Sequence, residues 1–558
     1  MNKVLLLLIT LTVAAAAQKQ NPQTEMALPS DSLQAKQGKP DAQSPQLELP
    51  DVLILGEDRY HRLVKNKKNL TPETPTIVEP QNAYVSPAFW HTRQGDKPYA
   101  GSVDSAAMRT WGRLLGGTFY TVAGDAGHWR KIPNGDAMAA LWIERSEGQY
   151  LNTQYAQGGF DGKINYALNE QATLTGRTAY DRHVYGLHTT GFHHPNSRRS
   201  VGNGMLAADL NYRLDRISSV GAGLEFGGLS MTTDTGGVEA AHSGNFFYHL
   251  RGEFNSSCRK TLLAVRGSYL HETLDTPKDS VGSSAHFGEI GVELMRPLSP
   301  FLSATVGMGL QGFGADTTSS SRPAGLARIN FIPNGLVGAL LQISSGMRYA
   351  TFADYWRQNR YLVHTFDQVT AEEKIGVKAD FDLQTSAAIK LHVGFHRRRM
   401  AKLPFWQADS ANGLIALKML SDVEITQVEL GVAADLGALG TLYAAFIDYA
   451  DDARSGSGHL NQIPYRPDFR LPVRAALHLP AGINVTATAE LVGARRKQFG
   501  SDAVLPAHFR FALDADRRFS RHITALLTVR NLFNTRYSIW ENYPETGFIV
   551  MAGIRARF

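Results

Sequence analysis

The feature that most constrains this chain is an alternation of apolar and polar residues that recurs from about residue 110 to the end. From Ile483 to Leu491 every second residue is apolar, and Asn, Thr and Glu fill the positions between. The same period returns in residues 377–383 and 509–516. Successive side chains of a strand point to opposite faces of its sheet. The pattern therefore predicts an all-β fold whose strands have one apolar and one polar face.

The spacing of the turns indicates what kind of sheet these strands form. Short breaks fall near Asn169, Asp215, Ser257, Ser299, Asn334, Thr385, Ala438, Ala481 and Ser520. Longer polar breaks lie between them, at 190–203, 230–244, 274–284, 315–324, 400–412, 450–468 and 535–546. Short turns at one end and long loops at the other are typical of an outer-membrane barrel.

These turns set the number of strands. Hairpins at the short breaks account for roughly 18 strands, and residues 110–168 have room for more. A sheet in hydrocarbon must close, because lipid satisfies no free strand edge. We predict a transmembrane antiparallel β-barrel of about 20 to 22 strands over residues 96–558. The alternation alone also allows soluble sandwiches or a propeller.

The first residues predict export from the cytoplasm. Lys3 precedes an apolar run that ends in Ala15-Ala16-Ala17. This is the pattern of a signal peptide over residues 1–17, with an N-terminal membrane anchor as the alternative. Residues 18–95 are rich in Gln, Pro and Ser, so we expect a flexible periplasmic extension. No later stretch has about 18 consecutive apolar residues, which argues against a bundle of membrane helices.

Composition removes several classes of function. One cysteine excludes a disulfide framework and cysteine-based metal centres. The net charge of +6 is spread along the chain, so we expect no nucleic acid partner. We find no nucleophile elbow and no metalloprotease motif, and we expect neither an enzyme nor a bound cofactor or metal. Residues 307–312 match a dinucleotide fingerprint but lie within an alternating strand.

Two charged groups are weaker candidates for binding. His193 and His194, with Arg198, could bind a ligand, although an adjacent pair in a loop is usually only solvated. The arginine run 397–399 is predicted to end a strand near the long loops, where lipopolysaccharide phosphates lie. A solvated charge run is the competing interpretation.

The last strand carries a predicted assembly signal. Apolar residues alternate to a terminal aromatic residue, a pattern expected of barrels that the outer-membrane assembly machinery inserts. An ordinary terminal strand is the alternative. The residues of the predicted signal are Phe548, Val550, Ile554 and Phe558.

The segment just before this strand resembles the carboxy-terminal end of TonB-dependent outer-membrane receptors. The matching residues are Asn531, Leu532, Phe533, Asn534, Tyr537, Tyr543, Pro544 and Gly547. The resemblance implies a barrel in a Gram-negative type outer membrane that takes up a small-molecule solute. It also implies contact with lipid, lipopolysaccharide and the assembly machinery, and with a TonB-like energy transducer.

The N-terminal region of the chain differs from that of the family. Its receptors carry a plug of well over a hundred residues, whereas the extension here is shorter, polar and rich in Pro. One short segment resembles the start of a plug or an energy-coupling box, or is a short strand that adds to a sheet edge. It consists of Asp51, Val52, Leu53, Ile54, Leu55 and Gly56.

The barrel is therefore predicted to have no conventional plug. Inward-folded loops, residues 51–95 or a partner must fill it. We expect a pore or an uptake receptor, with a non-transporting scaffold that docks a surface or secreted partner as the alternative.

Overall fold

The computed structural model describes residues 110–558, apart from 151, 188–196, 236–237, 277–281, 317, 334–335, 365–366, 410–412 and 455–459. The predicted signal peptide, the extension with its segment 51–56, and residues 96–109 lie outside the described residues. His193 and His194 also lie outside them.

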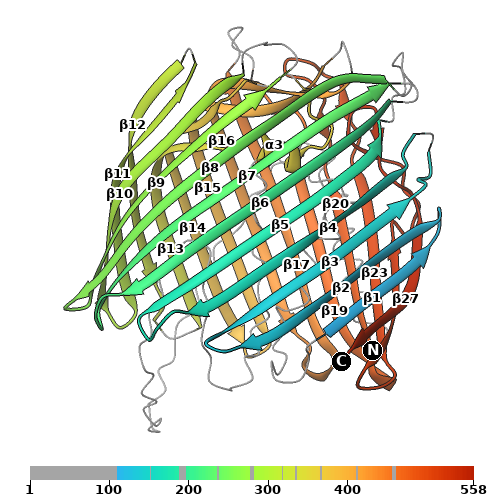
Figure 1. Cartoon of the computed structure of the whole chain (residues 1–558), viewed down its shortest axis with the longest axis horizontal. Coiled ribbons are helices and arrows are strands. Elements are labelled where there is room, and N and C mark those ends of the chain that lie inside the picture. The colour runs from blue at the N-terminus through green and yellow to red at the C-terminus, as the bar shows by residue number, and fades with distance from the viewer. Residues whose placement is uncertain are drawn as a thin grey trace, which may run out of the picture. The chain divides into compact units, whose positions relative to one another are not determined.

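The described residues form one closed antiparallel barrel. Each wall strand pairs with the next along the chain, and the last strand pairs with the first (Figure 1). The sheet of 23 strands consists of 22 wall strands and the two-residue strand β18, which extends the end of β17. The predicted fold class and the upper end of the predicted strand number are therefore confirmed.

The strand bounds are as follows. The first eleven wall strands are β1 Thr110–Gly117, β2 Thr121–Ile132, β3 Gly135–Ser146, β4 Tyr155–Ala167, β5 Ala172–Gly186, β6 Ser197–Arg213, β7 Ser218–Thr235, β8 Val238–Cys258, β9 Thr261–Asp275, β10 Ser283–Ser299 and β11 Leu302–Ala315. The other eleven are β12 Thr318–Phe331, β13 Val337–Tyr349, β14 Thr370–Ser386, β15 Ile389–Ala408, β16 Ile415–Asp435, β17 Gly440–Arg454, β19 Phe469–Leu479, β20 Ile483–Val492, β23 His508–Arg518, β24 Ile523–Arg530 and β27 Ile549–Arg557.

Short elements lie in the connections. They are α3 Phe352–Gln358, the 3-10 helices η2 Gly437–Leu439 and η3 Pro480–Gly482, and the strands β18 Leu460–Asn461, β21 Arg495–Arg496, β22 Val504–Leu505, β25 Ser538–Trp540 and β26 Tyr543–Pro544. Among the described residues, no helix is long and apolar enough to cross a membrane.

The predicted short turns all lie at one end of the barrel, the end where β27 finishes. The turn between β8 and β9, for example, contains only residues 259 and 260. At the other end, two predicted long loops are wrong, because β7 and β8 continue through most of 230–244 and β11 and β12 through most of 315–324. Strands that extend beyond the bilayer have water on both faces, so their sequence loses the apolar alternation there.

Two other boundaries also need correction for the same reason. β6 already begins at Ser197, and β15 continues to Ala408. The arginine run 397–399 therefore lies inside β15 and does not end a strand.

The apolar face of the strands points outward and the polar face points inward, as a membrane barrel requires. Large apolar side chains are exposed on the outer wall of strand after strand, as Ile290, Leu310 and Leu430 illustrate. We call this surface the outer belt. The polar face is the inner wall, where Glu490 of β20 pairs with Arg470 of β19 and Arg510 of β23. An apolar outside and a charged inside are the reverse of a soluble barrel, so this wall spans a bilayer.

A candidate gate in the barrel mouth

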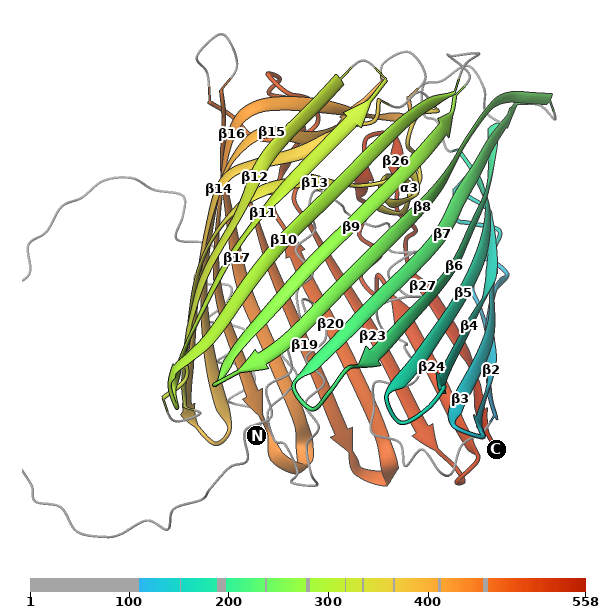
Figure 2. The same ribbon diagram turned by 60° about the vertical axis from the view of Figure 1, so that its left-hand side comes forward.

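Loops at the long-loop end fold into the barrel and form an apolar core there. α3 lies within the outline of the barrel near that end in both views (Figures 1 and 2), and β26 does so in Figure 2. We call this core the mouth cluster. It joins loop residues to the inner wall, and its buried members are Tyr185, Leu187, Val201, Leu229, Met231, Leu274, Phe352, Ala353, Tyr355, Trp356, Tyr361, Leu362, Val363, Trp406, Leu414, Ile415, Ala416, Tyr465, Leu505, Tyr537, Ile539, Trp540 and Tyr543.

The helix α3 supplies one side of the mouth cluster. Thr351 caps it, because its hydroxyl accepts a hydrogen bond from the Asp354 amide while the Asp354 carboxylate accepts one from the Thr351 amide. The wall then fixes this end, since the Phe352 amide donates to Glu272 of β9 at 2.8 Å. The side chains of Asn245 and Tyr349 also donate to Glu272. A seven-residue helix is too short to be stable alone, so the wall must hold it.

Aromatic rings join the two inward loops. Tyr361, which follows α3, stacks on Tyr543 of β26 with ring centroids 3.6 Å apart. Trp540 of β25 contacts Trp406 of β15 and Tyr465, at centroid distances of 5.9 and 4.9 Å. The loop between β13 and β14 therefore touches the loop between β24 and β27 inside the barrel.

Two buried arginines of the wall region hold the backbones of these loops. Arg199 of β6 donates from Nη1 to the carbonyl oxygens of Arg360 and Leu362, at 3.0 and 2.7 Å. Arg495 of β21 donates to the carbonyl oxygens of Ser538 and Ile539, at 2.8 and 3.2 Å. A guanidinium satisfies several carbonyls at once, so each arginine fastens one loop.

His364 is buried beside Arg199. Its Nε2 lies 2.7 Å from the Thr233 hydroxyl, and its Nδ1 lies 2.9 Å from the Ser243 hydroxyl. Thr233 also accepts a hydrogen bond from Nε of Arg199 at 3.1 Å, so its own proton points to His364. Burial, together with the nearby Arg199 charge, lowers the pKa of His364 to about 3. The imidazole is therefore neutral at physiological pH.

Glu545 lies in the loop that carries β25 and β26, and it is buried. Burial raises the pKa of its carboxyl to about 6, although Arg360, Arg510 and Arg495 oppose the rise. Its amide donates to the carbonyl of Tyr537 at 2.9 Å. The loop therefore brings a carboxyl that titrates near neutral pH into the mouth cluster.

The predicted family motif organises this same loop. Asn531 donates from its side chain to the carbonyls of Thr535 and Thr546, and Asn534 accepts from the Phe548 amide at 3.1 Å. Both asparagines have positive φ, a conformation that asparagine tolerates well. Gly547 has no room for a side chain, because a Cβ there would lie 2.3 Å from Oδ1 of Asn534.

The other motif residues divide between the lumen and the outside. Tyr537 and Tyr543 are buried in the mouth cluster, and Tyr543 donates to the carbonyl of Gly413 at 3.1 Å. Pro544 is part of β26. Leu532 and Phe533 are exposed.

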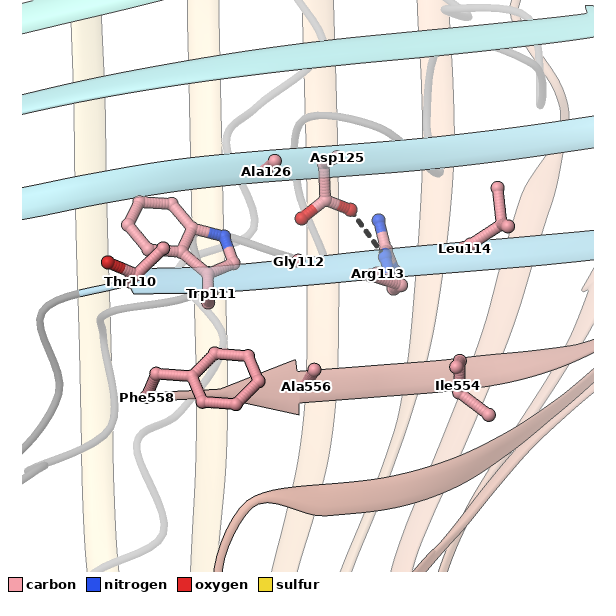
Figure 3. A pocket seen from close by; sticks show the side chains of 10 residues that line it. All are labelled: Thr110, Trp111, Gly112, Arg113, Leu114, Asp125, Ala126, Ile554, Ala556 and Phe558. Carbon is pink, nitrogen blue, oxygen red and sulfur yellow. Dashed lines mark hydrogen bonds and ion pairs between the residues drawn. The ribbon is translucent and has the colours of Figure 1, made fainter.

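The predicted assembly residues lie along the final strand and at its start. Ile554 and Phe558 are exposed on the outer wall, while Phe548 and Val550 are partly buried. Figure 3 shows a shallow groove of about 400 Å³ at the seam of β27 with β1 and β2. Phe558 and Ile554 line it, and Arg113 pairs beside it with Asp125 at 2.5 Å. The role of these residues in assembly stays a prediction.

Among the sequence candidates that the structure describes, only the motif tyrosines belong to the mouth cluster. Arg198 is in β6 and exposed, next to the buried Arg199 that sequence reasoning missed. A capping box at Thr351 and Asp354, followed by Tyr355 and Trp356, was a signal that could have revealed α3.

The closed wall, the outer belt and the charged lumen define a membrane-spanning β-barrel with loops of its own packed inside its mouth. No protein-family model matches the sequence, and no curated protein is similar enough to count as a relative. Solved structures do share the fold.

Three of these structures illustrate the likeness. The iron transporter FrpB from Neisseria meningitidis (F3-3 variant) aligns with a TM-score of 0.65 at 11% identity, over 81% of each chain. The siderophore receptor PiuA from Acinetobacter baumannii aligns with 0.63 at 12%, over 81% of this chain and 82% of its own. The copper transporter OprC aligns with 0.67 at 10%, over 81% and 80%. The resemblance to TonB-dependent receptors is confirmed at the level of the barrel fold.

Proposed function

We propose that this protein is an outer-membrane barrel of the TonB-dependent-receptor type that takes up a small or medium-sized solute. The mouth cluster is its gate. The observation that carries the proposal is the stacking of Tyr361 on Tyr543, which joins two loops across the lumen. Solute passes only when these loops separate. The shared barrel of iron, siderophore and copper carriers supports uptake as the task.

The inner wall gives the channel its selectivity. Charged side chains line it in complementary groups, such as Asp382 with His392 and Lys390, and Glu490 with two arginines. Rings of fixed charge of this kind select the solutes that pass through a pore. Export by the signal peptide and contacts with lipopolysaccharide and with a TonB-like transducer belong to the same proposal.

A conductance experiment tests the gate. The full chain and a variant in which residues 352–363 are replaced by a Gly-Ser linker are inserted into planar bilayers. The full chain should be nearly silent, and the variant should conduct ions and pass sized sugars in a liposome-swelling assay. If neither conducts, the protein is no channel, and the scaffold that docks a partner becomes the better hypothesis.

Uptake is tested in cells that express the protein at a matched surface level. Labelled iron and copper complexes are the first probes, because carriers of these metals share the barrel. Uptake above that of cells without the protein supports the proposal. Recovery of the protein in the soluble fraction after a carbonate wash would contradict the outer-membrane location.

A further inference from the structure

Two histidines lie side by side on the barrel wall, away from the mouth cluster. His271 of β9 and His286 of β10 are directly opposed in register, on strands that Figure 2 shows next to each other. Their Nδ1 atoms are 3.0 Å apart. The hydroxyl of Tyr269 lies 2.6 Å from the same Nδ1 of His286. Nδ1 of His286 therefore has two close neighbours, a second imidazole nitrogen and a phenolic hydroxyl.

The alternation of β10 puts this pair on the outer wall. Ile290, four residues from His286 and thus on the same face, is 60% exposed and belongs to the outer belt. His286 lies on the long-loop side of Ile290 and is itself exposed. On its other side it faces Gly314 of β11, where an added Cβ would meet nothing within 4 Å. The pair is therefore open to solvent at the edge of the belt.

Hydrogen bonding alone makes one nitrogen of this arrangement serve two partners. The Nδ1 of a neutral imidazole carries either a proton or one lone pair. If Tyr269 donates to Nδ1 of His286, the lone pair is already used, and Nδ1 of His271 must share it. A cation between the two imidazoles removes this conflict, because each nitrogen then offers its lone pair to the ion.

The distance between the nitrogens fits one ion. Imidazole nitrogens bind zinc at about 2.0–2.1 Å. The angle between two such bonds lies between the square-planar and the tetrahedral value. The two nitrogens are then roughly 2.9–3.4 Å apart. The observed 3.0 Å lies in this range.

We propose that His271 and His286 bind a divalent transition-metal ion on the outer wall. Imidazole favours Zn²⁺, Cu²⁺ and Ni²⁺ over Ca²⁺ and Mg²⁺, which prefer oxygen ligands. Among the described residues, no group of three or more His, Cys, Asp or Glu side chains is placed to hold a metal. Water and the Tyr269 hydroxyl therefore complete the coordination. The ion links β9 to β10, and the site is independent of the proposed uptake function.

The matched control is a third histidine of the outer wall. His242 of β8 is exposed, and its ring lies 3.3 Å from the Thr232 hydroxyl. The test uses the full chain, purified in detergent without a polyhistidine tag, and four variants: His271→Gln, His286→Gln, the double variant and His242→Gln. Heat-modifiable gel mobility shows that each variant has assembled.

The measurements are calorimetric titration with Zn²⁺ and electron paramagnetic resonance with Cu²⁺. We expect one site, at least tenfold weaker binding in either single variant, and no change in His242→Gln. The Cu²⁺ spectrum should show two nitrogen ligands in the wild type and fewer in the single variants. Equal Zn²⁺ affinity in the wild type and the double variant would overturn the proposal.

Discussion

Neighbouring residues of β6 have opposite environments. Arg198 is exposed, whereas Arg199 is fully buried in the mouth and binds two loop carbonyls. The period of two in a strand explains this difference, since successive side chains leave on opposite faces. The printed sequence shows both arginines but not which one meets a loop 160 residues further on.

The first prediction concerns this arginine. Arg199→Gln removes charge-assisted hydrogen bonds to the backbone of the β13–β14 loop, with a loss of about 2 kcal/mol. The open fraction of the mouth should rise roughly thirtyfold, seen as more frequent openings in planar bilayers. Arg198→Gln is the matched control and should behave as the wild type. Equal opening in both variants would show that Arg199 does not fasten the gate.

The second prediction concerns pH. The pKa of His364 is about 3 in the folded mouth, below its usual value of about 6.5. As the pH falls, His364 is therefore protonated at a higher pH in the unfolded loop than in the folded mouth. Its contribution to the stability of the folded loop is lost progressively between pH 6.5 and 3. Glu545 acts in the opposite sense, because its pKa of about 6 lies above the usual range and acid favours its buried form.

A comparison of the wild type with His364→Gln isolates the effect of the histidine on pH dependence, because Glu545 is present in both proteins. From pH 6.5 to 5.5, loop opening in the wild type should rise roughly fivefold relative to the variant. Hydrogen exchange of the amides of residues 352–364 measures this opening. A ratio that stays constant with pH would mean that His364 is not the titrating group.

The sequence predicts the strands correctly over the part of the wall that lies in the membrane. Segments such as 483–491 alternate because one face meets lipid and the other water, and β20 covers Ile483–Val492. Where β7, β8, β11 and β12 extend beyond the belt, this constraint ends and the loop predictions failed. α3 was missed because seven residues give too little helical period to detect, and its stability comes from the wall.

The third prediction concerns β27. Deletion of Phe558, or Phe558→Asp, should lower the assembled level more than Arg555→Ala. Phe558 is exposed on the outer wall, where an apolar ring suits lipid and the proposed assembly machinery. Arg555 shares a face of the strand with Arg557 and lies on the opposite face from Phe558. Its loss should therefore be tolerated. Heat-modifiable mobility measures assembly, and equal levels would contradict the signal.

At the scale of the whole molecule, the barrel and its strand number could be predicted, but the gate could not. Three tryptophans, Trp356, Trp406 and Trp540, come from segments that lie far apart in the sequence and meet in the mouth cluster. Trp406 and Trp540 fall in the predicted long breaks 400–412 and 535–546, whereas Trp356 falls in no predicted break. Long-range packing of this kind leaves no local period, which is why the pattern of the sequence did not reveal it.

The fourth prediction concerns energy coupling. Ile54→Pro removes a backbone donor from any strand that residues 51–56 add to a partner. We expect solute flux through the assembled barrel to stay unchanged, because the barrel is predicted to have no conventional plug for a transducer to pull. Flux is compared at matched surface levels, with and without a proton-motive force. Collapse of flux under either treatment would show that uptake is energised and that residues 57–95 act as a reduced plug.

The pairing of β27 with β1 also fixes the order in which the protein can be completed. A hydrogen bond at this seam joins residues 432 positions apart in the chain. Without β27, β1 and β24 each lack one partner and present a free edge, which invites aggregation. A chain that lacks this strand therefore leaves the sheet open. Closure thus tests whether β27 is present, since only a chain that contains it can become a ring.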